Sequence, residues 1–156
     1  MGEQEPKLKP SELSKRSIGL ADLAARQLKH DFLGTEHLLL GLINPRNTAA
    51  KGRPNLAIQV LGDLGLDIND LKISMTEVIQ SPTENPPGEG SLPVTSRFKT
   101  IWEIAIEEAM TRQATEVDPE HILLAIAKEA ESAAAQVLGM YDIDYSKIDD
   151  QLKKID

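Results

Sequence analysis

The sequence GTEHLLLGL at residues 34–42 returns in a related form, DPEHILLAI, at residues 118–126. Glu36 and Glu120 occupy the same place in the two copies, which gives an offset of 84 (120 − 36). Self-similarity at a fixed separation is the sequence signature of an internal repeat. The chain is therefore predicted to contain two halves with the same fold.

A second matching block shows where the two halves differ in length. Val-Leu-Gly at residues 60–62 aligns with Val-Leu-Gly at residues 137–139, an offset of 77 (137 − 60). The first half therefore holds seven extra residues (84 − 77) between the two blocks. We place them within residues 44–54, NPRNTAAKGRP, because Asn, Pro and Gly are typical of a loop.

Proline and glycine separate the two halves. The stretch SPTENPPGEGSLP at residues 81–93 contains four prolines and two glycines, a composition that excludes a helix or a central strand. We predict a flexible leader at residues 1–10, a first repeat at residues 11–80, a linker at residues 81–93 and a second repeat at residues 94–156. Both repeats are expected to pack as one domain.

Apolar residues at helical spacing run through both halves. Hydrophobic residues make up 40% of the chain and aromatic residues only 3%, which suits a core of Leu, Ile, Val and Ala between helices. We predict an all-α fold of eight helices, arranged as two four-helix repeats about an approximate twofold axis. The helices are expected at residues 11–29, 35–43, 54–64 and 68–79, after the caps Thr95 and Asp118, and at residues 131–140 and 144–155.

Charge and composition argue against several classes of partner. The formal net charge is −8, and an acidic surface repels the phosphate backbone of nucleic acids. The chain has no cysteine, which excludes disulfides and fits a reducing compartment such as the cytoplasm. No apolar run approaches the roughly 18–20 residues of a membrane-spanning helix. We expect neither nucleic acid nor membrane as a partner.

Signatures of catalysis are absent from the sequence. It contains no GxxxxGK[ST] phosphate loop, no GxGxxG motif and no GxSxG nucleophile elbow. The three histidines, His30, His37 and His121, form no i, i+4 pair, and three converging ligands are needed for a metal site. We predict no catalytic residue, no metal and no cofactor. His37 and His121 are expected to pack and to satisfy nearby backbone groups.

Glu36 and Glu120 each lie at the start of a predicted helix. One interpretation is purely structural, because a carboxylate in the first turn complements the helix dipole. The other is a mixed binding site. The free N–H groups of the first turn would attract an anion and the carboxylate a guanidinium or ammonium group. A ligand that carries both charges, such as a modified arginine, would suit such a site.

A family resemblance follows from the same residues. The sequence HDFLGTEHLLLGLI at residues 30–43 closely resembles the GTEH(I/L)LLGL signature of the Clp N-terminal (Clp R) domain of ClpA- and ClpC-type unfoldases. Residues 118–126 look like its second copy, and LGDLGL at residues 61–66 resembles the LxxLGL element of the family. The resemblance covers residues 11–155 and implies a domain that receives substrates and adaptor proteins. By position it also implies phosphoarginine binding by Thr35, Glu36 and Glu120.

The second copy departs from the family pattern. Asp118 and Pro119 stand where the family usually has Gly-Thr. Pro119 has no N–H to donate, and the charge of Asp118 repels phosphate. We therefore expect the first repeat to hold the stronger site.

Two functions are expected from this resemblance. The first is a non-enzymatic domain that recognises substrates, adaptors or degradation marks such as phosphoarginine in the Clp system, with Clp unfoldase or protease subunits as further partners. The alternative is an accessory protein, similar to plastid ClpT, that binds and stabilises a Clp protease or chaperone ring. The divergent leader and loop favour a free-standing protein over a fragment. The expected location is the cytoplasm, or the plastid stroma for a ClpT-like relative.

Overall fold

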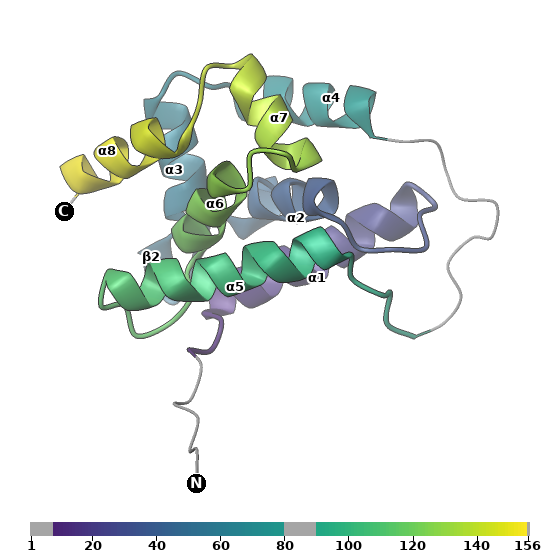
Figure 1. Cartoon of the computed structure of the whole chain (residues 1–156), viewed down its shortest axis with the longest axis horizontal. Coiled ribbons are helices and arrows are strands. Elements are labelled where there is room, and N and C mark those ends of the chain that lie inside the picture. Colours follow the sequence, from purple (N-terminus) through teal and green to yellow (C-terminus); the bar gives the residue numbers. More distant parts are fainter. Residues whose placement is uncertain (1–7, 80–89, 156) are drawn as a thin grey trace, which may run out of the picture.

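The computed structural model describes residues 8–79 and 90–155, and within these ranges the chain folds almost entirely into helices (Figure 1). The predicted all-α fold of eight helices is confirmed. A short 3-10 helix, η1 (Pro45–Asn47), and a two-stranded hairpin lie between the second and third helices. The α-helices are α1 (Glu12–Gln27), α2 (Thr35–Leu42), α3 (Leu56–Asp63), α4 (Ile68–Val78), α5 (Ser96–Thr111), α6 (Pro119–Lys128), α7 (Ala133–Met140) and α8 (Tyr145–Ile155).

The helix boundaries reproduce the repeat found in the sequence. Helices α5 and α6 follow α1 and α2 at an offset of 84 (96 − 12 and 119 − 35). Helices α7 and α8 follow α3 and α4 at an offset of 77 (133 − 56 and 145 − 68). The change of offset falls in the connection between α2 and α3, where the extra residues were predicted.

Capping residues determine where most helices begin. The side chains of Ser11, Asp67, Asp144 and the predicted cap Thr95 each accept a hydrogen bond from a backbone N–H of the first turn. The predicted third helix begins two residues later than expected, because Asn55 caps it by accepting from Ala57 N–H at 3.0 Å.

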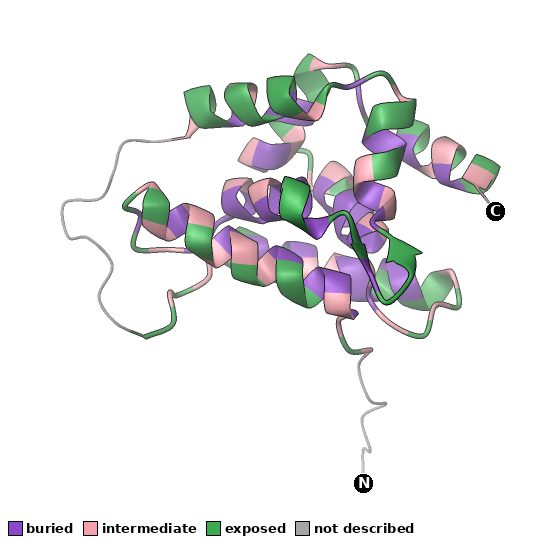
Figure 2. Cartoon of the chain, turned by 180° about the vertical axis from the view of Figure 1, so that it is seen from behind, coloured by how far each residue is buried: buried purple, intermediate pink, exposed green. Residues whose placement is uncertain are grey.

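The predicted loop at residues 44–54 is more ordered than its composition suggests. After η1, β1 (Ala49–Ala50) pairs antiparallel with β2 (Arg53–Pro54), and the hairpin is seen from the other side in Figure 2. Two buried asparagines hold it in place: Asn47 Nδ2 donates to Ser17 Oγ at 2.8 Å, and Asn55 Nδ2 donates to Asn47 O at 2.8 Å. The seven extra residues thus form a fixed projection on the first repeat.

Extended segments cross between the two repeats. Pro10, before α1, forms an isolated parallel bridge with Val117, before α6. Leu33, before α2, forms the equivalent bridge with Val94, before α5. Pro10 corresponds to Val94 and Leu33 corresponds to Val117 at the repeat offset of 84, so exchanging the two halves turns one bridge into the other. Such an exchange is what an approximate twofold axis between the halves produces. They are made by the hydrogen bonds Ser11 N–H to Val117 O (2.9 Å), Val117 N–H to Lys9 O (2.9 Å), Leu33 N–H to Pro93 O (2.8 Å) and Thr95 N–H to Leu33 O (3.0 Å).

These bridges involve residues that were expected in connecting segments. Lys9 and Pro10 were predicted as part of the flexible leader and Pro93 as part of the linker, yet all three belong to the paired segments. The rest of the predicted leader, residues 1–7, and residues 81–89 of the predicted linker lie outside the described residues.

One apolar core joins both repeats. Helices α2 and α6 lie in the middle of the molecule in Figure 1, with α1 and α5 on one side and α4, α7 and α8 on the other. Residues 122–126 of α6 are completely buried, and helices of one repeat contact helices of the other, such as α3 with α8 and α4 with α7. No helix in the described ranges is long and apolar enough to cross a membrane. The central position of α2 and α6 fixes the two helix starts that carry the motifs.

Candidate functional site

The first motif forms the start of α2, and Gly34 is its N-cap. No side chain caps this helix, and no hydrogen bond within the described residues engages the backbone N–H of Thr35 or Glu36. Thr35 is buried, and the Glu36 side chain is 18% exposed. The first turn therefore offers backbone N–H groups and one carboxylate side by side.

Glycine at position 34 leaves room for the carboxylate of Glu36. A Cβ atom added to Gly34 would lie 2.0 Å from Glu36 Oε1, because the glutamate side chain folds back over the glycine. A larger residue at this position would require the flexible Glu36 side chain to adopt another position. The GTE sequence thus determines where the negative charge is held.

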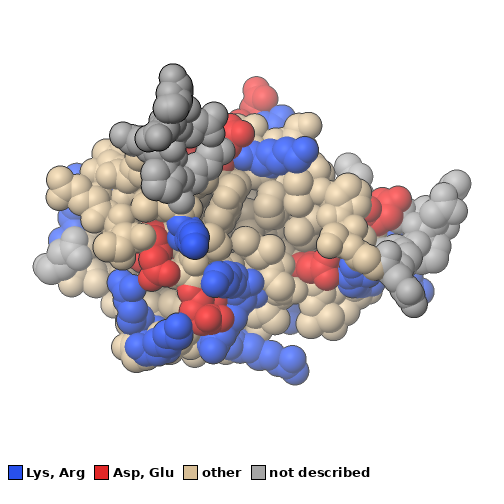
Figure 3. Space-filling view, turned by 90° about the horizontal axis from the view of Figure 1, so that it is seen from below, with Lys and Arg blue, Asp and Glu red and all other residues tan. Residues whose placement is uncertain are grey.

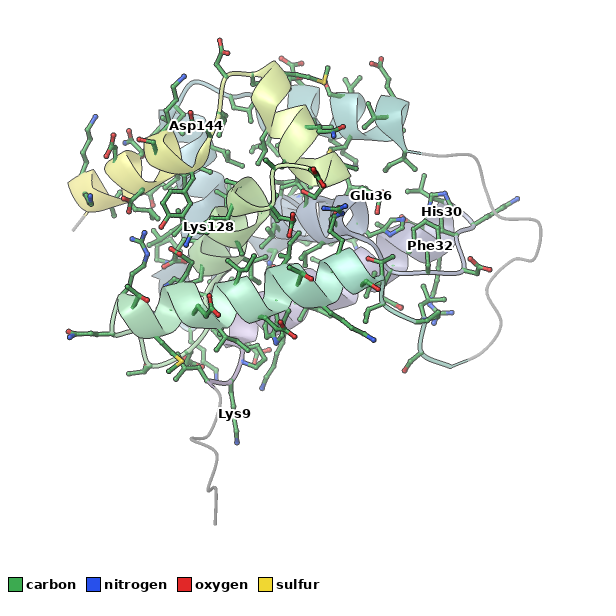
Figure 4. The ribbon with its side chains drawn as sticks, in the orientation of Figure 1. Lys9, His30, Phe32, Glu36, Lys128 and Asp144 are labelled. Carbon is green, nitrogen blue, oxygen red and sulfur yellow. The ribbon has the colours of Figure 1, made fainter. Side chains whose placement is uncertain are left out.

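His37 fixes the backbone before α2. Gly34 N–H donates to His37 Nδ1 at 2.9 Å, so the neutral ring carries its proton on Nε2 and donates it to His30 Nδ1 at 2.8 Å. Phe32 stacks on His30 with ring centroids 5.1 Å apart, and Figure 4 shows Glu36, His30 and Phe32 near one another around this helix start. Burial, together with the neighbouring His30, lowers the pKa of His37 to about 4.

The second motif repeats this backbone geometry at the start of α6. Asp118 N–H donates to His121 Nδ1 at 2.9 Å, the same distance as in the first motif. Together the two bonds confirm the predicted role of His37 and His121 in satisfying nearby backbone groups. Pro119 occupies the first position of α6, so this helix start presents one N–H fewer than α2.

The surroundings of Glu120 are more acidic than those of Glu36. Asp118 precedes it by two residues, and burial and the charge of Asp118 raise the pKa of Glu120 to about 7. A hollow of about 240 Å³ lies beside it, lined by Leu13, Gly52, Arg53, Pro54, Leu56, Asp118 and Glu120. The hairpin of the first repeat therefore forms one wall of the second motif's surroundings.

An arginine of the hairpin already approaches this acidic group. Arg53 Nη1 lies 3.7 Å from Glu116 Oε1, and Arg53 Nη2 lies 4.0 Å from Asp118 Oδ2. These separations, with Arg53 62% exposed, describe a loose pair that is individually weak. On the face seen in Figure 3, cationic and acidic side chains are likewise interspersed at one end.

The structure places the three predicted binding residues at two separate helix starts. Thr35 and Glu36 lie together at α2, and Glu120 lies at α6. Glu116 and Arg53 were not predicted as neighbours of the second motif. The only available signal was that the extra segment at residues 44–54 contains three cations and no acid. Among the residues that the structure describes, no group of three His, Asp or Glu side chains could hold a metal ion.

Solved structures with the same fold include N-terminal domains of Clp-type proteins. The N-terminal domain of the chaperone ClpD from Arabidopsis thaliana superposes with a TM-score of 0.67 at 21% identity, covering 95% of this chain and 98% of that domain. A complex of the ClpV N-domain with VipB peptide matches with a TM-score of 0.66 at 16% identity, covering 90% and 86%. At these identities the likeness shows a shared fold.

Similarity in sequence, in addition to fold, relates the chain to Clp proteins. Chloroplastic chaperone protein ClpC1 of Arabidopsis thaliana is 33% identical over 141 residues, which cover 86% of this chain and 14% of ClpC1. The chain spans 14–16% of the length of such relatives. Residues 9–141 match the Clp repeat (R) N-terminal domain, which is most of the chain. This match, together with the paired helix starts, shows that the chain belongs to the Clp repeat (R) N-terminal domain family.

Proposed function

We propose that this chain is a protein-binding domain of the Clp chaperone–protease system, with the start of α2 as its main recognition site for degradation marks such as phosphoarginine. The observation that carries the proposal is the uncapped first turn of α2 with the Glu36 carboxylate folded beside it. Backbone N–H groups at a helix start favour phosphate, and a carboxylate favours a guanidinium. Phosphoarginine presents both groups on one side chain.

The start of α6 is the weaker site in this proposal. Pro119 removes one N–H donor, and Asp118 adds a negative charge that repels phosphate. Arg53 already lies beside this acidic group. Glu120 is protonated in part near neutral pH, because its pKa is raised to about 7, so it attracts a guanidinium less strongly than an ionised carboxylate would.

Calorimetry with free phosphoarginine tests the proposal. We expect Glu36→Ala to weaken binding by about tenfold or more, because a charge-assisted pair is lost, and Glu120→Ala to weaken it by less than about threefold. Arginine and phosphoserine serve as ligands that lack one of the two charges. Equal losses for the two variants, or no binding by the unmodified chain, would contradict the proposal.

The proposed role is recognition without catalysis. The sequence lacks the phosphate-loop motif of a nucleotide hydrolase, and we assign the chain neither an enzymatic activity nor a cofactor. The proposed partners are substrate proteins, adaptors and Clp unfoldase or protease subunits. The proposed location is the cytoplasm, or the plastid stroma, where chloroplastic relatives such as ClpC1 would be found.

The hairpin of the first repeat favours a second candidate function, that of an accessory protein on a Clp ring. Arg46, Lys51 and Arg53 are exposed on this segment, which the second repeat lacks and which buried asparagines hold in place. A fixed cationic projection suits attachment to an acidic surface of a larger assembly. In a pull-down, retention of the peptidase core without substrate would support this role, whereas retention of an unfoldase or of marked substrates would support recognition.

A further inference from the structure

The second repeat fills the cleft between α5, α6 and α8 with its own polar side chains. Glu108 is buried there, and its carboxylate accepts hydrogen bonds from Lys128 Nζ at 2.7 Å, Tyr145 Oη at 2.7 Å and Arg112 Nε at 3.3 Å. Arg112 Nη2 also donates to Asp149 Oδ1 at 2.6 Å. This network spans all three helices and closes the cleft.

The first repeat leaves the equivalent cleft open. The two repeat offsets, 84 for the first two helices and 77 for the last two, place Ala24, Leu28, Asn44, Ile68 and Lys72 where the second repeat has Glu108, Arg112, Lys128, Tyr145 and Asp149. All five of these residues line a single cleft of about 140 Å³ between α1, the end of α2 and α4. Ala24 occupies the position of the buried acid Glu108, so the first repeat has no carboxylate that could bind the surrounding side chains together.

The open cleft has apolar flanks. Leu23 on α1 lines it and is 42% exposed, and Ile73 on α4 is 57% exposed in an adjoining hollow. Large apolar side chains left in water on both sides of an apolar cleft are characteristic of an interaction surface. A cleft of this size accepts one bulky apolar side chain, and the flanks would contact its neighbours.

The charge at the rim indicates which partner fits. In the second repeat Asp149 pairs with Arg112, whereas in the first repeat Lys72 stands opposite Leu28. Within the described residues Lys72 makes no ion pair, although Glu77 lines the adjoining hollow, so the ammonium group at the cleft is available to a carboxylate of a partner. A partner that brought a carboxylate to this rim would gain an ion pair next to a desolvated surface.

We propose that the cleft between α1, α2 and α4 binds a segment of a partner protein that inserts a bulky apolar side chain and places a carboxylate against Lys72. This site is distinct from the helix starts that carry Glu36 and Glu120. The proposal for this cleft therefore does not depend on phosphoarginine recognition at those helix starts. In this arrangement the first repeat receives from another protein what the second repeat supplies internally.

Backbone amide NMR of the whole chain, titrated with three blocked peptides, tests the proposal. The probes are EELLEELLEE, KKLLKKLLKK and EESSEESSEE, which separate the contributions of charge and apolar side chains. The acidic apolar peptide should shift resonances in residues 20–28 and 68–76 and should bind at least about tenfold more tightly than either of the others. Glu36→Ala should leave this binding unchanged.

Two variants copy the second repeat into the first. Lys72→Asp, at an exposed position, should reverse the preference so that KKLLKKLLKK binds more tightly than EELLEELLEE, whereas the control Lys99→Asp, on the exposed face of α5, should not. Ala24→Glu should abolish binding by placing a carboxylate in the cleft. Shifts located elsewhere, no binding at millimolar peptide, or an unchanged preference in Lys72→Asp would overturn the proposal.

Discussion

The two repeats hold the starts of their central helices in the same way but surround them differently. In each, the N–H of the N-cap residue donates to a histidine Nδ1 at 2.9 Å. Glu36 has a glycine and a threonine before it, whereas Glu120 has Asp118 and a proline. The comparison teaches that the residues that maintain the helix start are separate from those that decide what it can bind.

The clefts of the two repeats also differ, because the second is filled by polar side chains and the first is open. The second repeat ties α8 to α5 and α6 through buried Glu108, and the first repeat has Ala24 in that position and an apolar opening beside α4. The second repeat thus fills its cleft with its own side chains, whereas at its helix start Arg53 of the first repeat forms only loose pairs. We interpret the first repeat as the half that is available to other proteins and the second as the half that stabilises the domain.

The largest expected effect concerns how closely the first two helices of each repeat approach. A Cβ on Gly41 of α2 would lie 2.0 Å from the carbonyl oxygen of Ser17 in α1, whereas the equivalent residue in α6 is Ala125. Gly41→Ala should destabilise the fold by about 3 kcal/mol, because backbone cannot move aside. Urea unfolding measures this. Ala125→Gly is the matched control and should cost about 1 kcal/mol; equal losses would show that the two helix pairs pack alike.

The buried acid of the second repeat should give the next largest effect. Glu108→Ala leaves Lys128, Tyr145 and Arg112 without their shared acceptor and should lower the free energy of unfolding by about 2 kcal/mol. Chemical unfolding of this variant and of the isosteric Glu108→Gln measures the loss. A change below about 0.5 kcal/mol would mean that the network contributes no more than exposed ion pairs do.

Glu120 should make stability depend on pH. Its carboxyl group binds a proton more tightly in the folded chain, with a pKa of about 7 against a usual 4.5. Its contribution to stability is therefore fully present below pH 4.5 and is lost as the pH rises through 7. Between pH 5 and pH 8 the wild type should lose stability on the order of 1 kcal/mol that Glu120→Gln does not lose. Unfolding both proteins at the two pH values measures this difference. Parallel curves for the two proteins would contradict this expectation.

The smallest effect is expected for Arg53. Its loose pairs with Glu116 and Asp118 are exposed, so Arg53→Ala should change stability by less than about 0.5 kcal/mol. The same change should raise the pKa of Glu120 further, because the positive charge of Arg53 helps to lower it. NMR titration of the Glu120 carboxyl measures the shift, with Lys51→Ala on the same hairpin as the control. An unchanged pKa of Glu120 would show that the charge of Arg53 does not act on the second motif.

Most of the fold could be predicted from the sequence, because its signals are local or periodic. The repeat offsets, the apolar spacing and the cap Thr95 located the helices to within a few residues. The role of His37 and His121 also followed from their repeated position. The two-residue strands of the hairpin could not be predicted, since each pairs only two residues and the anchoring asparagines act through tertiary contacts.

The missing parts of the candidate site depend on long-range contacts. Arg53 and Asp118 meet across two different repeats, and no local pattern relates them. Proline-rich composition made Pro10 and Pro93 look like ends of connecting segments, although their neighbours pair with residues far along the chain. Matching the five residues around Glu108 to those around Ala24 required knowing which helices enclose a cleft.

The crossed bridges mean that neither half is complete on its own. The segment that leads into α1 pairs beside α6, and the segment that leads into α5 pairs beside α2. A polypeptide cut once between the halves should therefore yield two pieces that reassemble into one particle when mixed. A half expressed alone would lack its complement and could regain one by associating with a second identical half.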